Sequence, residues 1–379
     1  MARTLILGGG FGGISVATEL RKLVSEDHEI VLVDRGERFS MGLRKLWELV
    51  GQATIVEGSR PREALAAHGV RVVRAEIDAI DPAARAATVG GETIEADHLV
   101  VALGAVSRPD LVPRLVEHGH DVWSTGGVPG AAEALDELDG GRVLVLVAGA
   151  PYPCPPAPFE CVMHVDEYLR ARGIRDRTEL AVATIQPMLL PNAGAGGSAW
   201  MADQLATRDI AFEVGAKIER VAEESVVLTD SELPFTLLIA VPPHCAPEVV
   251  RASGLTAESD WVAVDKWTFA TEWPGVHAVG DVTQILLANG LPLPKAGVIA
   301  ELEGSLVARA IARVGESRGL NFDGVASCYV EMGSEVAARV DADWYATPAP
   351  VVSIAEPSSA YAEEKRQFER ERLERWFGG

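Results

Sequence analysis

The chain contains two strand-to-helix turns of the type that binds nucleotides, and only one of them keeps its glycines. The first, residues 5–13, reads Leu-Ile-Leu-Gly-Gly-Gly-Phe-Gly-Gly. The second follows the apolar run 143–147 and opens with Ala-Gly-Ala, but residues 151–161 then read Pro-Tyr-Pro-Cys-Pro-Pro-Ala-Pro-Phe-Glu-Cys. Prolines crowd such a turn, and they lack the N–H donors that a pyrophosphate needs. The sequence therefore predicts one bound dinucleotide and places Cys154 where a second would lie.

The charge and the apolar runs of the chain limit its partners and its location. The 379 residues include 34 basic and 55 acidic ones, which gives a net charge of −21. This excess repels nucleic-acid backbones, so we expect no nucleic-acid partner. No apolar run reaches the roughly 18 residues of a membrane-spanning helix, and the first run is too short for a signal peptide. We therefore expect a cytoplasmic protein, in which a cysteine pair is more often redox-active than structural.

The order of the expected elements predicts an α/β fold with two Rossmann-like domains and a C-terminal interface tail. Strands alternate with helices through the first part of the chain, which is typical of a parallel sheet. We expect a discontinuous cofactor-binding domain from residues 1–110 and 246–320. Residues 111–245 form a second Rossmann-like domain without a nicotinamide glycine loop. Residues 321–379 form a tail with a late cysteine and a charged terminal helix.

The first glycine turn has the spacing of a dinucleotide-binding motif. Gly8, Gly10 and Gly13 match G-x-G-x-x-G, in which the glycines allow a tight turn, a close approach of backbone to pyrophosphate, and helix–strand packing. Asp34 follows where an acid bonds the ribose hydroxyls. This motif alone fits NAD and FAD equally well.

Two later segments resemble the FAD motifs of flavin disulfide-reductase-like proteins. Residues 97–105, which contain Gly104, are similar to the strand and turn that close the nucleotide site in that superfamily. Residues 271–281 are similar to its second FAD motif, with Gly280 and Asp281 at the end of a strand. The resemblance implies FAD as the cofactor. Lys295 opens the next helix, where its charge would add to the helix dipole beside a reduced flavin.

The cysteine-bearing segments make the resemblance more specific. Residues 154–160, 292–297 and 326–333 resemble the sulfide:quinone oxidoreductase and flavocytochrome c sulfide dehydrogenase group. The resemblance implies that Cys154 and Cys328 form a redox pair beside the flavin. It also implies that Glu160 transfers protons near a quinone. The absence of a leader argues against the flavocytochrome branch.

The residues themselves support a reactive Cys154. Two prolines after it suit the first turn of a helix, and a helix N-terminus lowers the pKa of a thiol. Cys161, one turn further, either faces the same site or fills the interior. His164 and His244 are alternatives to Glu160 as proton carriers. No cysteine or histidine spacing indicates a metal site.

These observations predict FAD-dependent oxidation of sulfide, or of a related sulfur species, with electrons passed to a quinone at the membrane surface. The loop 189–197 lacks the histidine expected of a quinone-reducing member, which leaves donor and acceptor open. The charged terminal helix, residues 363–377, has three possible roles. It contacts the inner face of the membrane, packs on the domain surface, or forms a homodimer contact. The alternatives for function are a type II NADH:quinone dehydrogenase and a redox-sensing flavoprotein without enzymatic activity.

Overall fold

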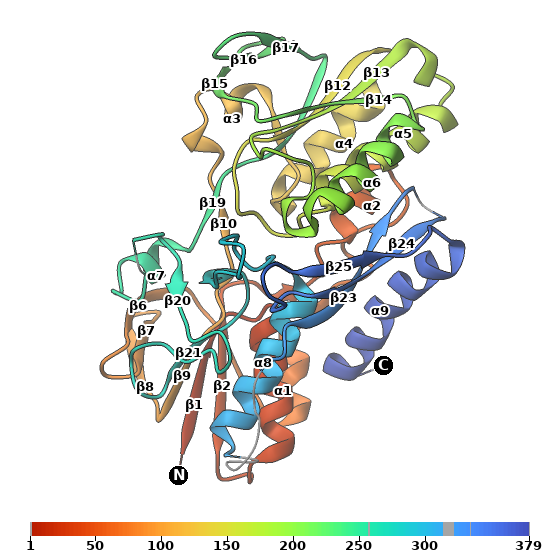
Figure 1. Ribbon diagram of the computed structural model, residues 1–379. Coiled ribbons are helices and arrows are strands. Elements are labelled where there is room, and N and C mark those ends of the chain that lie inside the picture. Colours follow the sequence, from red (N-terminus) through yellow and green to blue (C-terminus); the bar gives the residue numbers. More distant parts are fainter. Residues whose placement is uncertain (1, 257, 314–321, 334, 379) are drawn as a thin grey trace.

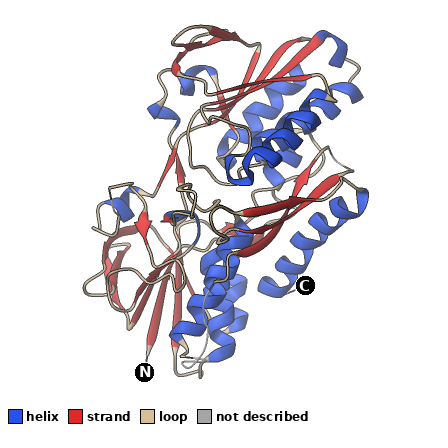
Figure 2. Ribbon diagram, in the orientation of Figure 1, coloured by secondary structure: helices blue, strands red, loops and turns tan. Residues whose placement is uncertain are grey.

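The computed structural model describes residues 2–256, 258–313, 322–333 and 335–378. Two five-stranded parallel sheets with helices against them dominate the fold, as the alternation of strands and helices predicts (Figures 1 and 2). The fold class is therefore confirmed. The expected boundary at residues 320 and 321 lies outside the described residues, and the exact domain limits stay a prediction.

The first sheet joins an N-terminal segment with a much later one. Its order is β21-β9-β1-β2-β5, and all its pairings are parallel. The strands are β1 (Arg3–Leu7), β2 (Glu29–Asp34), β5 (Arg71–Arg74), β9 (His98–Val101) and β21 (Val276–Ala278). Helices α1 (Phe11–Leu23) and α8 (Gly297–Ile311) lie side by side against it (Figure 1). The central strands are buried on both faces, which explains their continuous apolar sequences.

The second sheet has the order β11-β18-β12-β13-β14, again with parallel pairings. Its strands are β11 (His120–Asp121), β12 (Gly141–Val147), β13 (Thr178–Thr184), β14 (Ile210–Val214) and β18 (Leu237–Val241). Its helices are α4 (Val128–Glu137), α5 (Ala157–Ala171) and α6 (Gly194–Ala206). The chain enters and leaves this part through β10 (Val106–Ser107) and β19 (His244–Cys245), which pair with each other.

The remaining elements are short or form small sheets. They are β3 (Arg38–Phe39), α2 (Arg44–Leu49), β4 (Arg60–Pro61), β6 (Ile77–Asp81), β7 (Ala86–Val89), β8 (Glu92–Glu95), α3 (Leu115–His118), β15 (Ile218–Val221), β16 (Ser225–Leu228), β17 (Glu232–Pro234), α7 (Glu248–Arg251), β20 (Val262–Ala263) and β22 (Thr283–Gln284).

The C-terminal part is an antiparallel sheet covered by a long helix. Strands β23 (Val325–Glu331), β24 (Ala337–Asp343) and β25 (Val351–Ile354) pair in that order, and α9 (Ser359–Phe377) lies beside them (Figure 1). The apolar side chains of α9 pack into the first domain. The Trp376 ring lies 5.5 Å from that of Phe11 and 5.6 Å from that of Phe39. The aromatic face of α9 is therefore used in packing, the second of the three roles considered for it.

Candidate functional site

Cys154 lies at the carboxyl end of β12, where a ligand normally binds in a sheet of this kind. Its backbone is left-handed, with φ of +59°. A non-glycine residue in this region costs about 1–3 kcal/mol, so its surroundings must hold it there. The Trp123 indole N–H donates to the Pro153 carbonyl at 2.8 Å, and the Cys154 N–H donates to the Lys295 carbonyl at 2.7 Å. The proline-rich bend thus holds Cys154, an exposed residue, in one backbone conformation.

The structure brings Cys328 of β23 into electrostatic contact with Cys154, although more than 170 residues separate them in sequence. Both are free thiols, and Cys328 is half-buried. Burial, Glu160 and Cys328 together raise the pKa of Cys154. Burial and Glu160 likewise raise the pKa of Cys328 to about 12. Their role as a redox pair stays a prediction.

The expectation that a helix N-terminus lowers the pKa of Cys154 is wrong. Although Cys154 as a residue is exposed, protein atoms surround its thiol, and this burial is the largest cause of the raised pKa. Glu160 in the first turn of α5 adds a negative charge that opposes the helix dipole. Lys365 acts in the opposite direction on both cysteines.

A buried ionic cluster lies next to the two cysteines and consists of Glu160, Glu331 and Lys365. The Lys365 ammonium donates to Glu160 Oε1 at 2.6 Å and to Glu331 Oε2 at 2.8 Å. The backbone N–H of Glu331 donates to the same Glu160 oxygen at 2.7 Å, and Trp47 Nε1 lies 3.1 Å from both Glu331 oxygens. The three charged side chains are between 1% and 7% exposed. The cluster therefore joins α5, β23 and α9 at one point.

The cluster strongly shifts the pKa values of two of its members. Burial alone would lower the pKa of Lys365, but Glu160 and Glu331 outweigh it and raise that pKa. Burial alone would raise the pKa of Glu331, but Lys365 and His164 outweigh it and lower that pKa. Glu331 lies within the segment 326–333 that carries the resemblance but was not singled out there, and Lys365 belongs to no motif. One signal could have identified Lys365: it lies on the face of α9 that also carries the buried Leu373 and Trp376.

Two other predicted candidates lie close to the cluster. His164 is fully buried, and its Nε2 lies 3.2 Å from Glu331 Oε2, whereas its Nδ1 has no hydrogen-bond partner in the described part of the chain. Cys161 is also fully buried and packs in the apolar interior of the second domain. Burial and Glu160 raise the pKa of Cys161 to about 12. A catalytic role for Cys161 stays a prediction. His244 lies apart from this cluster, and burial lowers its pKa to about 4.

Lys295 is buried, and its ammonium forms hydrogen bonds with a neighbouring turn. Its ammonium donates to the carbonyls of Asp281 at 2.6 Å and Thr283 at 2.8 Å. It also lies 3.6 Å from the centre of the Trp261 ring. Burial lowers its pKa to about 8. Lys295 thus fastens the segment that precedes α8 to the Gly280–Asp281 turn.

The residues around the first glycine turn fit a dinucleotide. A Cβ on Gly10 would meet no atom within 4 Å, so the N-terminus of α1 is open to a phosphate. Asp34 closes the turn by accepting N–H bonds from Gly9 and Gly36, both at 2.7 Å. Gly104 and Gly280 have φ of +66° and +77° at the ends of β9 and β21, where the same ligand would pass. Burial raises the pKa of Asp281 beside this turn.

Two alanine substitutions separate packing from cofactor binding in this turn. A Cβ on Gly13 would lie 1.9 Å from the Gly8 carbonyl oxygen, so we expect Gly13→Ala to destabilise the protein by about 1–3 kcal/mol. Gly10→Ala should leave the stability of the cofactor-free protein unchanged but lower its affinity for FAD. Thermal unfolding of the cofactor-free protein and the flavin content of the purified protein measure the two effects. Equal loss of stability in both variants would contradict this division of roles.

The second turn has no room for a nucleotide. A Cβ on Gly149 would lie 2.3 Å from the Cα of Pro243, so the turn is packed directly against the returning chain. The prolines at 151, 153, 155 and 156 remove the N–H groups that would hold a pyrophosphate. That the chain binds a single dinucleotide stays a prediction, which this packing supports.

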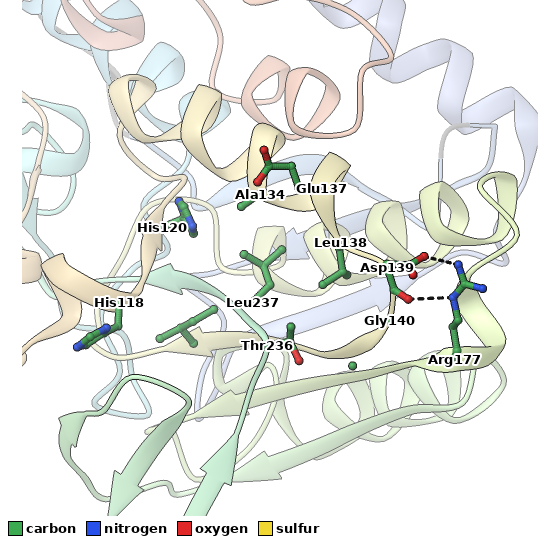
Figure 3. A pocket seen from close by; sticks show the side chains of 12 residues that line it. His118, His120, Ala134, Glu137, Leu138, Asp139, Gly140, Arg177, Thr236 and Leu237 are labelled. Carbon is green, nitrogen blue, oxygen red and sulfur yellow. Dashed lines mark hydrogen bonds and ion pairs between the residues drawn. The ribbon is translucent and has the colours of Figure 1, made fainter.

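A separate cavity of about 570 Å³ lies at the opposite edge of the second sheet (Figure 3). It is found where β12 and β18 begin, and the Arg177–Asp139 pair closes one end of it. Ligands in sheets of this kind bind at the carboxyl ends of the strands, so this cavity is not the candidate site.

Comparisons with known proteins agree with the geometry. The sequence pattern described as pyridine nucleotide-disulphide oxidoreductase matches residues 2–304. The chain is 24% identical to the mitochondrial sulfide:quinone oxidoreductase of Mus musculus, over 91% of this chain and 78% of that one. It is 23% identical to a type II NADH:quinone oxidoreductase of Staphylococcus aureus, over 83% of each. The crystal structure of the sulfide:quinone oxidoreductase from Aquifex aeolicus superposes with a TM-score of 0.89 at 23% identity, covering 100% of this chain and 92% of that one.

Proposed function

Because this chain belongs to the pyridine nucleotide-disulphide oxidoreductase family, a group of FAD-dependent oxidoreductases, we propose that it oxidises sulfide or a related sulfur species and passes the electrons to a quinone. The observation that carries the proposal is the proline-rich bend that bears Cys154 beside Cys328. This bend occupies the place where an NADH-dependent relative would bind its nicotinamide nucleotide. Sulfur chemistry is thereby favoured over hydride transfer from NADH.

The two cysteines can take up sulfide by thiol–disulfide exchange. In the oxidised enzyme, hydrosulfide attacks one sulfur of a Cys154–Cys328 disulfide. The bond between the two cysteines breaks, a new S–S bond forms in a cysteine persulfide, and the other cysteine leaves as a thiolate. Loss of the outer sulfur as sulfane sulfur leaves two reduced cysteines, which hold the two electrons taken from HS⁻. Re-formation of the disulfide between them passes these electrons on, so that HS⁻ gives one sulfur atom, one proton and two electrons in all. FAD, when bound, supplies the two-electron acceptor beside this pair.

The ionic cluster supports the acceptor half of the proposal. Reduction of a quinone to a quinol consumes two protons, and we assign their delivery to Glu160, a buried carboxylate of this cluster. Lys365 fixes the position of Glu160 and compensates its charge. We propose that the quinone binds next to this cluster. Because quinones are dissolved in membranes, this proposal implies a peripheral contact of the protein with a membrane. None of the helices in the described part of the chain is long and apolar enough to cross a membrane.

The donor is tested by mixing the oxidised flavoprotein under anaerobic conditions with sulfide or with NADH. We expect sulfide to bleach the visible absorbance of the flavin at least about 100-fold faster than NADH, since the second nucleotide turn is filled. Rapid bleaching by NADH and none by sulfide would overturn the proposal in favour of a type II NADH dehydrogenase. Bleaching by neither donor, with full FAD content, would favour a flavoprotein without this enzymatic activity.

A further inference from the structure

Lys45 of α2 is a cation that the sequence analysis did not single out, and hydrogen bonds tie it to the cysteine-bearing bend. Its half-buried ammonium donates to the Trp123 carbonyl oxygen. The indole of the same tryptophan donates to the carbonyl of Pro153, which directly precedes Cys154. The neighbouring Arg44 anchors α2 by two bonds of 2.7 Å to Glu369 of α9. Lys45 is therefore held in place beside the bend.

The charges around Lys45 come from several elements. Burial lowers the pKa of Lys45, whereas Asp121, Cys154 and Asp281 raise it. His244 of β19 faces the same region, since Lys45 is among the groups that lower its pKa. The pKa of Cys154 is governed by burial, Glu160, Lys365 and Cys328, and Lys45 is not among the groups that set it.

The site needs such a cation because the sulfur species in the proposed reaction are anions. Hydrosulfide and persulfide are negatively charged, and Glu160 already places a carboxylate near both cysteines. Lys295 cannot serve, because its ammonium is bound to the carbonyls of Asp281 and Thr283. Lys365 is bound between two carboxylates. Among the described residues, the Lys45 ammonium donates to the neutral Trp123 carbonyl and forms no ion pair with a carboxylate.

We propose that Lys45 is the anion-binding residue of the site and attracts small anionic sulfur species to Cys154. The choice of sulfur as the anion depends on the function proposed above, whereas the attraction of anions to Cys154 does not. An anionic reagent should therefore react with the Cys154 thiolate faster, relative to a neutral reagent of similar size, than it would without a nearby cation. This relative rate should fall when the charge at position 45 is removed.

The experiment compares alkylation of Cys154 by anionic iodoacetate and by neutral iodoacetamide in the reduced full-length protein. Peptide mass spectrometry reports the rate at Cys154 separately from the other cysteines. The ratio of the two rates cancels any change in the thiolate fraction, since both reagents attack the same thiolate. Lys45→Gln keeps a donor for the Trp123 carbonyl but removes the charge. Lys45→Arg keeps the charge, and Lys217→Gln removes an exposed lysine elsewhere.

We expect Lys45→Gln to lower the iodoacetate-to-iodoacetamide ratio about five-fold, and the other two variants to stay within about two-fold of the unmodified protein. Added salt should lower the ratio in the unmodified protein and have little effect in Lys45→Gln. An unchanged ratio in Lys45→Gln would overturn the inference even if sulfide reduces the flavin. A lowered ratio in a protein that sulfide does not reduce would retain the inference and reject the proposed donor.

Discussion

Replacement of Cys154 by serine is expected to slow the reduction of the flavin by sulfide at least about 1,000-fold. A hydroxyl can neither form a disulfide with Cys328 nor carry a persulfide, so the exchange step has no route. The fold should persist, because the thiol is exposed and a serine occupies nearly the same volume. Stopped-flow absorbance of the flavin after anaerobic mixing with sulfide measures the rate. Thermal unfolding and flavin content verify that the variant is intact.

Two other cysteines provide controls for this result. Cys245 lies on β19 at the junction between the two domains, outside the site, so Cys245→Ser should change the rate by less than about three-fold. Cys161→Ala distinguishes a redox role from a packing role: a packing role predicts lower stability with a normal rate. A Cys154→Ser variant that sulfide reduces at the normal rate would reject Cys154 as the entry point for electrons.

Replacement of Lys365 by methionine is expected to destabilise the protein by about 3–5 kcal/mol. The substitution leaves Glu160 and Glu331 buried, close together and without their shared cation, which is the costly way to break a buried ion pair. The midpoint of thermal unfolding measures the effect, with exposed Lys217→Met as the matched control. The triple variant Glu160→Gln, Glu331→Gln, Lys365→Met removes the charges together and should recover most of the loss. Equal stability of Lys365→Met and the control would contradict the role given to this cluster.

The same substitution should alter the dependence of stability on pH. The folded pKa of Glu331 lies below its unfolded value of about 4.3, so its carboxylate contributes stability above that pH and loses it as the pH falls towards about 2. Lys365→Met removes the cation that lowers this pKa. We therefore expect the variant to lose less stability than the unmodified protein across this acidic range, in thermal unfolding measured at several pH values.

The parts of the fold that the sequence predicted are those set by local patterns. Apolar runs such as 143–147 and the glycines at 8, 10 and 13 specify strands and tight turns by themselves, so the two parallel sheets were predictable. Cys154 was predictable because it interrupts a local motif. The direction of its pKa shift was not predictable in this way. The helix dipole was expected to lower the pKa, whereas burial and Glu160 raise it.

The residues that sequence reasoning missed are brought together only by long-range packing. Glu331 and Lys365 reach Glu160 because β23 and α9 fold back onto α5, and no spacing in the sequence records this contact. Lys45 lies on a helix of six residues without a motif of its own. Their partners depend on the relative placement of three parts of the chain, which local periodicity does not determine.

The ion triad also sets an order of events during translation. The ribosome adds Lys365 after both of the carboxylates that it neutralises, and domains generally begin to fold from the N-terminal side as the polypeptide emerges. Until α9 docks, Glu160 and Glu331 lack the cation that compensates their charge in the folded protein. The ion triad therefore forms only after α9 has been made.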